Sequence, residues 1–309
     1  MKILVTGGAG FVGSHVVDRL LEDGHAVEVI DNLSTGRRER IHPNARLHVC
    51  DLRDARLVEV IATTRPDVVV HVAAQAAISR SVIDPRFDAS INVLGTIALL
   101  EACRLTGVRR IIYTSTGGAG YGDTDVLPTP EDHPLRPSSP YGVSKTAAER
   151  YVDCWMGLTG GRALTLRLAN VFGPRQDPAG EAGVVAIFTS RLLAGDPCIV
   201  TGDGEQTRDY VYVLDVAEAV SRAVVSPDVV GVMNIGTGVE KTVNDIYREL
   251  AQLTGVTVPP EHGPARPGEQ RRSVLDATRA KKRLGWSAAT PFGESLRQTV
   301  AWFRKELSS

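Results

Sequence analysis

The sequence predicts an α/β protein whose core is a Rossmann-type, doubly wound parallel sheet, with a smaller C-terminal lobe that closes over a ligand. Strand-like and helix-like patterns alternate with short links through the first half of the chain, as in parallel sheets covered by helices. A glycine-rich segment directly follows the first apolar run. Beyond about residue 172 the alternation gives way to segments rich in proline and glycine. The 309 residues suffice for one large unit and a smaller lobe.

Six apolar runs are expected to form strands of the large sheet. They cover residues 3–6, 26–31, 47–52, 67–72, 110–115 and 163–170. Apolar residues at helical spacing predict helices over 12–21, 54–63 and 84–105. A further helix is expected to begin at Pro140, because proline suits the first helical position and Ser139 can cap it.

Composition and charge exclude several classes of partner. The chain is 43% hydrophobic and 23% charged with a net charge of −1, and it has no long basic run. This predicts neither a nucleic-acid nor a membrane partner. The four cysteines lie far apart without a C-x-x-C pair, so we expect no metal site and reduced thiols. With no signal peptide and no apolar run near 18 residues, the prediction is a cytoplasmic protein.

The glycine-rich segment predicts a dinucleotide site. Gly8, Gly10 and Gly13 satisfy G-x-G-x-x-G, and Gly7 adds G-x-x-G-x-x-G. Glycines permit a tight turn and a close approach of backbone amides to a pyrophosphate, which the start of the next helix also attracts. We therefore expect residues 1–172 to form the dinucleotide-binding domain.

An acidic residue at the end of the second predicted strand selects the cofactor. Asp31 is placed to accept hydrogen bonds from the adenosine ribose and to repel a 2′-phosphate, which predicts NAD rather than NADP. Arg37 and Arg38 lie nearby and are the residues that would favour a phosphate instead. Residues 173–309 are expected to form mainly the substrate-binding lobe, with one or two segments near 210–236 returning to the large sheet.

A tyrosine and a lysine on the helix that begins at Pro140 form a candidate acid–base pair. Tyr141 and Lys145 are four residues apart and so share one helix face. A nearby ammonium and an oxidised nicotinamide favour the phenolate, and lowering a tyrosine pKa from 10 to near 7 requires about 4 kcal/mol. Ser115 and Thr116, at the end of a predicted strand, offer hydroxyls that can orient a substrate alcohol.

These motifs, in this order, resemble the extended short-chain dehydrogenases/reductases, and within them the sugar-nucleotide 4-epimerases. The matching segments are TGGAGFVGSH at 6–15, DNLSTG at 31–36, DLRD at 51–54, HVAAQ at 71–75, the serine segment at 114–122, YGVSK at 141–145, RLANVFGPRQDP at 167–178, TRDYVYVLD at 207–215, NIGTG at 234–238 and RPGE at 266–269. The resemblance implies an enzyme that inverts C4 of a UDP-hexose, with UDP-glucose and UDP-galactose preferred. It implies tightly bound NAD, transient oxidation to a 4-keto sugar, and a homodimer formed by the helices over 84–105 and 140–158.

The resemblance also assigns roles to individual residues. Tyr141 is implied as the base and acid, assisted by Lys145. The implied NAD contacts are Gly7, Gly10, Phe11, Val12, Asp31, Asn32, Ser34, Thr35, Gly36, Asp51, Leu52, Ala73, Ala74, Gln75, Asn92, Ser115, Tyr141 and Lys145. The implied substrate contacts are Asn170 at the sugar nucleotide, Val184 and Val185 near the uracil, Arg208 and Arg266 at the pyrophosphate, Glu269 at the uridine ribose and Ser273 as the gatekeeper.

The sequence departs from the family pattern at Gly117, where these epimerases carry a serine or threonine. We expect the hydroxyl of Thr116 to take over its role. Gly117 and Gly118 also disfavour a sugar-nucleotide dehydratase or decarboxylase, because those enzymes place acidic groups just after the serine or threonine. A sugar-nucleotide reductase stays a further alternative.

Two further hypotheses concern the substrate, and a third concerns the class of protein. A UDP-glucuronate 4-epimerase would carry a cation where this chain has Asp177, although Arg175 and Arg80 are nearby substitutes. A UDP-N-acetylglucosamine 4-epimerase is favoured by the small side chain of Ser273. A non-catalytic NAD-binding module is disfavoured by the intact pair of Tyr141 and Lys145.

Overall fold

A seven-stranded sheet in which all pairs are parallel forms the centre of the protein, in a computed structural model that describes residues 1–179, 183–265 and 270–307. Its order is β10-β6-β5-β4-β1-β2-β3. The strands are β1 (Lys2–Thr6), β2 (Ala26–Asp31), β3 (Arg46–Val49), β4 (Val68–His71), β5 (Arg110–Thr116), β6 (Arg162–Leu168) and β10 (Gly231–Ile235). The reversal of direction in the strand order, between β1 and β4, is the switch point at which such sheets bind nucleotides. The predicted α/β fold class is confirmed.

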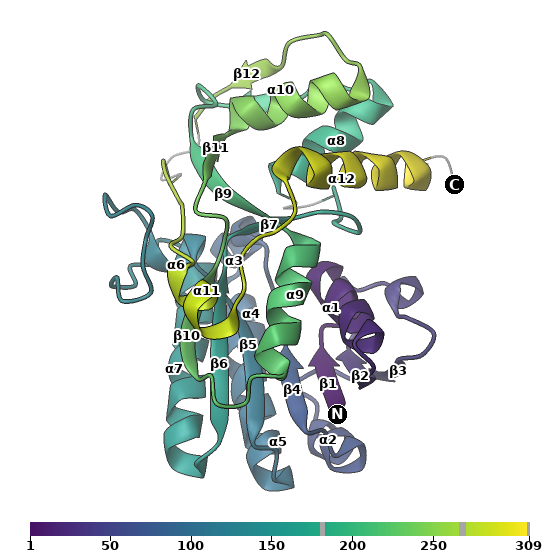
Figure 1. The fold of residues 1–309 in the computed structure, drawn as a ribbon, viewed down its shortest axis with the longest axis vertical. Helices are drawn as coiled ribbons and strands as arrows, with labels where there is room; N and C mark the ends of the chain where they lie inside the picture. Colours follow the sequence, from purple (N-terminus) through teal and green to yellow (C-terminus); the bar gives the residue numbers. More distant parts are fainter. Residues whose placement is uncertain (180–182, 266–269, 308–309) are drawn as a thin grey trace.

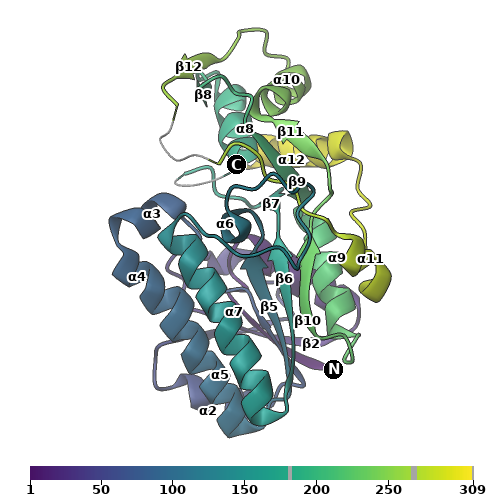
Figure 2. The ribbon, with the colours of Figure 1, turned by 90° about the vertical axis from the view of Figure 1, so that its left-hand side faces the viewer.

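Helices cover both faces of this sheet (Figures 1 and 2). One face packs against α1 (Phe11–Glu22) and α9 (Val213–Val224), and the other against α2 (Leu57–Thr64), α5 (Gly95–Thr106) and α7 (Pro140–Thr159). Alternate residues of β1 divide between the two cores, since Ile3 and Val5 belong to one and Leu4 to the other. This alternation follows from the period of two in a strand.

The helix expected over 84–105 consists of three consecutive segments. These are α4 (Pro85–Ala89), a π-helical turn at Ser90–Leu94, and α5; α3 (Ile78–Ile83) precedes them. The run Pro85–Thr106 is, among the described residues, the one helix long and apolar enough to span a membrane. The helix is interrupted by charged residues such as Asp88 and Glu101, so it is not the uninterrupted apolar run whose absence was expected from the sequence. The run packs against α2 and α7, as core helices of globular proteins do.

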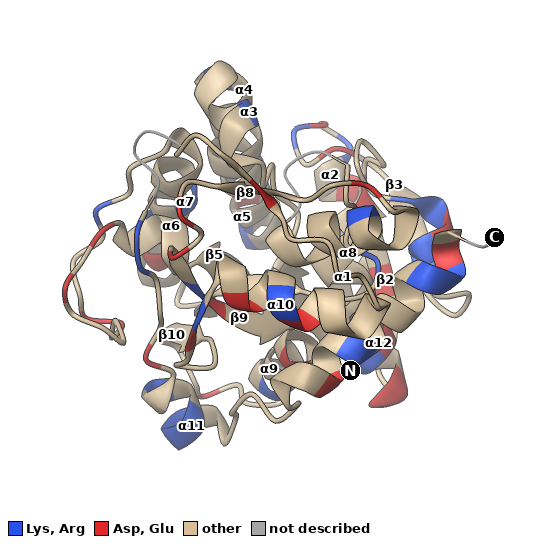
Figure 3. Ribbon diagram, turned by 90° about the horizontal axis from the view of Figure 1, so that it is seen from above, with Lys and Arg blue, Asp and Glu red and all other residues tan. Residues whose placement is uncertain are grey.

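A smaller lobe lies above the carboxyl ends of the strands (Figure 1). It contains α8 (Val184–Ala194), α10 (Val243–Thr254), α12 (Phe292–Leu307) and two small sheets, β11-β9-β7 and β12-β8. These strands are β7 (Asn170–Phe172), β8 (Ile199–Thr201), β9 (Thr207–Tyr212), β11 (Glu240–Thr242) and β12 (Glu261–Gly263). Aromatic rings such as Phe172, Phe188 and Tyr247 fill a third apolar core here. Charged side chains of both signs lie on α10 and α12 (Figure 3).

The chain crosses between the two lobes several times. The strand expected over 163–170 divides into β6 in the large sheet and β7 in the small one. Residues 232–236 largely coincide with β10 and do return to the large sheet, whereas 210–213 fall mainly in β9 of the small sheet. The two sheets are thus tied together by consecutive segments.

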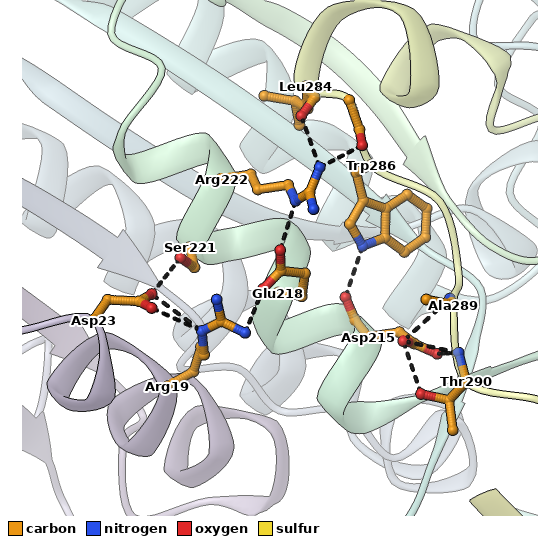
Figure 4. Close-up of polar contacts among 11 residues, drawn as sticks. Arg19, Asp23, Asp215, Glu218, Ser221, Arg222, Leu284, Trp286, Ala289 and Thr290 are labelled. Atoms are coloured by element: carbon orange, nitrogen blue, oxygen red, sulfur yellow. Dashed lines mark hydrogen bonds and ion pairs between the residues drawn. The ribbon is translucent and has the colours of Figure 1, made fainter. Parts of the chain in front are cut away.

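Polar contacts join α1, α9 and the segment that leads to α12 (Figure 4). Arg19 of α1 pairs with Glu218 of α9, and Ser221 donates to Asp23. Asp215, at the start of α9, accepts from the amide of Thr290 at 3.3 Å and from its hydroxyl at 3.0 Å. A buried carboxylate of this kind compensates backbone donors that would otherwise be unpaired.

We predict that Asp215→Ala lowers the free energy of unfolding by about 2–3 kcal/mol, because buried backbone amides lose a charged acceptor. Denaturant unfolding measures this change. Asp228→Ala is the control, since Asp228 forms an exposed pair with Arg162 and its loss should stay within about 0.5 kcal/mol. Equal effects of the two substitutions would contradict the role of Asp215.

Candidate active site

The glycine-rich turn between β1 and α1 fits the pyrophosphate of a dinucleotide. Gly7 has a φ of +74°, and its amide donates to the carbonyl of Ile30 at 2.8 Å. A Cβ on Gly13 would lie 2.0 Å from the carbonyl oxygen of Gly7, so α1 can begin this close to the turn only with glycine there. Gly10 caps α1 without a side-chain hydrogen bond, which leaves amides of the first helical turn free to bind an anion.

Asp31 ends β2 beside this turn with its carboxylate fixed. It accepts from the amide of Ala9 at 3.0 Å and from that of Leu33 at 2.8 Å, and it keeps lone pairs for a ribose. Arg37, a candidate contact for a 2′-phosphate, instead donates to Asp177 at 3.4 Å. The arrangement suits NAD.

The loop after β2 and the loop after β3 meet where the adenine is expected. Asn32 donates to Asp51 at 2.8 Å, and Arg53 donates to the same carboxylate at 2.8 Å. The hydrogen bonds from Arg53 hold the pKa of Asp51 well below its usual range. Leu52 is buried, and the exposed Asn32 is followed by Ser34, Thr35 and Gly36 in the same loop.

Other predicted cofactor contacts line the turn itself. Phe11 and Val12 begin α1 and pack against the core of the smaller lobe. The amide of Ala73 donates to the carbonyl of Thr6 at 3.0 Å, directly beside the glycine turn, and Ala74 follows it. These residues surround the place where the cofactor is expected.

Gln75 and Asn92 use their side chains within the protein. The side chain of Gln75 donates to Asp88 at 2.9 Å, and its backbone amide donates to the Asn92 Oδ1 at 2.9 Å. Asn92 in turn donates to Ser144 of α7 at 3.1 Å. Both predicted cofactor contacts therefore act here by linking the π-helical turn to the loop after β4 and to α7.

Tyr141 and Lys145 lie on the first turns of α7 against the end of β5. The helix begins at Pro140, capped by Ser139, as predicted. The side chain of Tyr141 hydrogen bonds with Thr116, and the Lys145 Nζ lies 4.4 Å from the centroid of the Tyr113 ring. The hydroxyl expected to replace the one missing at Gly117 is thus in contact with the predicted base.

Burial dominates the electrostatics of this pair. It raises the pKa of Tyr141 to about 12, while the hydrogen bond with Thr116 acts in the opposite direction. Burial also lowers the pKa of Lys145 to about 7, against the carboxylates of Glu149 and Asp88, which raise it. Desolvation thus disfavours both the phenolate of Tyr141 and the ammonium of Lys145. Whether these two groups are charged therefore depends on the charged and hydrogen-bonding groups around them.

Leu275 explains the glycine at position 117. A Cβ on Gly117 would lie 2.5 Å from the Leu275 Cδ1, so the space that a serine or threonine side chain needs is already filled. Ser115 lies on the same strand and is buried, and its hydroxyl has no hydrogen-bond partner within the described parts of the chain. Thr116 is therefore the hydroxyl that reaches Tyr141.

The predicted sugar contacts gather around Gly118. A Cβ there would lie 3.3 Å from the Ser273 Oγ and 3.7 Å from the Asn170 Oδ1. Ser273 is buried, and its carbonyl accepts the amide of Asp209 at 2.8 Å. Small groups therefore meet at Gly118, where the sugar is expected.

The structure describes three of the residues that are predicted to contact the nucleotide of the substrate. Arg208 lies in β9 and is half-buried, and Val184 and Val185 begin α8. The side chain of Val185 is fully buried in the core, so any contact with a uracil must come from its backbone. Arg266 and Glu269 lie outside the described residues.

Sequence reasoning missed two residues that shape the pocket. The first is Leu275, and the second is Asp209, a buried carboxylate that accepts from Thr237, Gly238 and the amide of Leu275. Asp209 thereby fixes the loop after β10 and places Leu275 against Gly117. The T-R-D-Y order indicated Arg208, but no local signal indicated the loop that Asp209 would hold. No cluster of three metal-ligating side chains occurs in the described ranges.

We predict that Gly117→Ser alone lowers the unfolding free energy by about 1–3 kcal/mol and impairs turnover, because the new Cβ overlaps Leu275. The double variant Gly117→Ser/Leu275→Ala should be more active and more stable than Gly117→Ser. Leu275→Ala alone is the control for cavity formation. If Gly117→Ser is fully stable and active by itself, the steric account is wrong.

Comparisons with known proteins identify the family of the chain. A sequence profile of the NAD dependent epimerase/dehydratase family matches residues 3–236. UDP-glucose 4-epimerase from Mycolicibacterium smegmatis is 46% identical over 99% of both chains. UDP-glucose 4-epimerase from Thermotoga maritima, solved with UDP-glucose, is 46% identical with a TM-score of 0.96, covering 99% of this chain and 100% of that one. UDP-glucose 4-epimerase from Thermus thermophilus, solved with NAD, is 44% identical with a TM-score of 0.93, covering 98% and 99%. The chain belongs to the NAD-dependent epimerase/dehydratase family.

Proposed function

We propose that the protein inverts C4 of a UDP-hexose by transient oxidation to a 4-keto sugar, with UDP-glucose and UDP-galactose as its preferred substrates. The observation that carries this proposal is the contact between Tyr141 and Thr116 beside the buried Lys145, at the carboxyl end of β5, which β4 separates from the strand that leads into the nucleotide turn. Relatives named UDP-glucose 4-epimerase match nearly the whole chain at 46% identity.

The glycine turn and Asp31 would hold NAD, which would supply the acceptor and donor of the C4 hydride. Tyr141 takes the proton of the 4-hydroxyl and later returns it, and Thr116 orients the phenolic oxygen. The ammonium of Lys145 stabilises the phenolate. Arg208 and Arg266 hold the diphosphate through charge-assisted hydrogen bonds, while the sugar turns within the pocket around Gly118. The proton that Tyr141 takes up is returned when the hydride returns to C4, so the enzyme ends in its starting protonation state and no net oxidation occurs.

The pocket favours neutral hexoses over glucuronate. Asp177 is directed at Arg37, Arg175 pairs with Asp18 at 2.7 Å, and Arg80 lies over the ring of Phe87 at 4.1 Å. Arg37, Arg175 and Arg80 thus already interact with other groups of the chain, which disfavours their use in binding the carboxylate of a glucuronate. N-acetylated hexoses remain the second candidate, because small groups at Gly118 and Ser273 leave room beside the sugar.

The exposed apolar side chains of α3 to α7 support a homodimer. Ile83, Leu94, Val143 and Leu158, which lie in these helical segments, are between 53% and 82% exposed. Apolar residues gathered on one face favour association. We propose that two copies pack through the helices α3 to α7. Light scattering tests this proposal, and a monomeric mass would contradict it.

The cysteines support a cytoplasmic location, which we also propose. Cys50, Cys103 and Cys198 are buried and form no disulfide, as is usual in a reducing compartment.

The function is tested by incubating the protein separately with UDP-glucose, UDP-glucuronate and UDP-N-acetylglucosamine and following the anomeric region by proton NMR without added reductant. We expect the C4 epimer of UDP-glucose to appear first. Epimerisation of one of the two other sugar nucleotides alone would change the substrate, and three intact compounds would overturn the proposed activity.

We predict that Thr116→Val lowers kcat about 10- to 100-fold, the size expected for a lost hydrogen bond to a charged group. Steady-state kinetics with UDP-glucose measure the change. Thr114→Val is the matched control, because Thr114 lies on the same strand but donates to the His71 carbonyl at 3.2 Å. An unchanged kcat in Thr116→Val would show that this hydroxyl does not assist Tyr141.

A further inference from the structure

A buried carboxylate that the mechanism above does not use lies behind the catalytic pair. Asp88 of α4 is 1% exposed. Its Oδ1 accepts from the Gln75 Nε2 at 2.9 Å and from the Asn92 Nδ2 at 3.1 Å, which suits an acceptor-only carboxylate. Its Oδ2 has no hydrogen-bond partner among the residues that the structure describes. A buried charged oxygen left without a partner calls for an explanation, because such an arrangement is unfavourable by itself.

Hydrogen bonds connect this carboxylate to the catalytic helix. Asn92 donates to the Ser144 Oγ at 3.1 Å, and the Ser144 Oγ donates to the carbonyl of Tyr141 at 3.0 Å. The link depends on the π-helical turn at Ser90–Leu94, which carries Asn92. The segments α4 and α7 pack directly against each other. Asp88 is thus tied through Asn92 and Ser144 to the backbone of Tyr141, on a helix that packs against α7.

The neighbouring ionisable groups on α7, β4 and β5 do not offer Lys145 an unpaired negative charge. Glu149, one turn further along α7, raises the pKa of Lys145 more than Asp88 does, but its carboxylate is already paired with the buried Arg167 at 2.7 Å. Burial, followed by the charge of Lys145, lowers the pKa of His71 to about 3, so this ring on β4 is neutral. Burial also raises the pKa of Tyr113, whose ring lies beside the ammonium.

We propose that Asp88 is a positioning residue whose buried carboxylate is the counter-charge that keeps Lys145 protonated beside Tyr141. The role rests on the proposed epimerase function. This role accounts for the Asp88 Oδ2 that has no hydrogen-bond partner among the described residues, since further hydrogen bonds to the carboxylate would weaken its interaction with the lysine. It also accounts for the hydrogen bonds from Gln75 and Asn92, because these uncharged amides fix the position of the Asp88 carboxylate and leave its negative charge in place.

The direction of the effect on pH dependence follows from the charge. The carboxylate raises the pKa of both Lys145 and Tyr141. Turnover needs a charged Lys145, so it falls as the pH rises through the lysine pKa; it also needs a phenolate, so it falls as the pH drops below the tyrosine pKa. Removing the carboxylate lowers both values. Both limbs of the profile should then move to lower pH.

The test is Asp88→Asn, which keeps the shape and the acceptor for Gln75 and Asn92 but removes the charge. We expect both limbs of the kcat–pH profile to move down by roughly half to one pH unit. A second readout is independent of turnover: side-chain NMR of labelled lysine, with the Lys145 signal identified by Lys145→Arg, should show Lys145 losing its proton at lower pH in Asp88→Asn.

Asp84→Asn is the matched control, because Asp84 caps α4 through the amide of Phe87 and is exposed. It should leave the pH profile in place. A merely structural role for Asp88 predicts a lower rate or melting temperature with both limbs and the lysine titration unmoved, and that result would overturn the proposal. Should the wild type not epimerise any UDP-hexose, the lysine titration still decides whether Asp88 sets the charge of Lys145.

Discussion

The burial of Lys145 is the constraint on which the rest of the site depends. An ammonium enclosed between α7 and β5 loses most of its hydration, and its pKa falls to about 7. The same burial raises the pKa of Tyr141 to about 12. Both shifts oppose the charged pair that acid–base chemistry at C4 requires. Surrounding carboxylates must therefore stabilise the ammonium, and the hydroxyl of Thr116 and the positive charge of oxidised nicotinamide must stabilise the phenolate, in place of water.

The packing of the two lobes places these groups with little freedom. Asp209 holds the loop after β10 and the backbone of Leu275, and Leu275 fills the space beside Gly117. The strand β6 leads directly into β7, so the large sheet and the small sheet share one continuous segment. Polar contacts from Asp215 fix the segment that leads to α12 (Figure 4). Function therefore depends on residues that never touch the reacting sugar.

The sequence was sufficient for the fold class and for the elements that present the cofactor turn, because glycine spacing and strand–helix alternation are local signals. Tyr141 and Thr116 were also found locally. The sequence did not reveal which side chains from distant segments contact one another. Leu275 lies far along the chain from Gly117, and the hydrogen bonds of Gln75 and Asn92 turn toward Asp88 rather than outward. The π-helical turn that allows this has no distinct sequence pattern.

The charge of Lys145 is expected to control the ionisation of Tyr141, and this coupling is central to the proposed chemistry. The most direct measurement is the pH titration of tyrosinate absorbance in the NAD-loaded protein, with Tyr141→Phe subtracted, compared between the wild type and Lys145→Met. We predict that Tyr141 ionises at lower pH in the wild type, because the ammonium stabilises the phenolate. Identical midpoints in the two proteins would show that Lys145 does not act on Tyr141 and would contradict the proposed coupling.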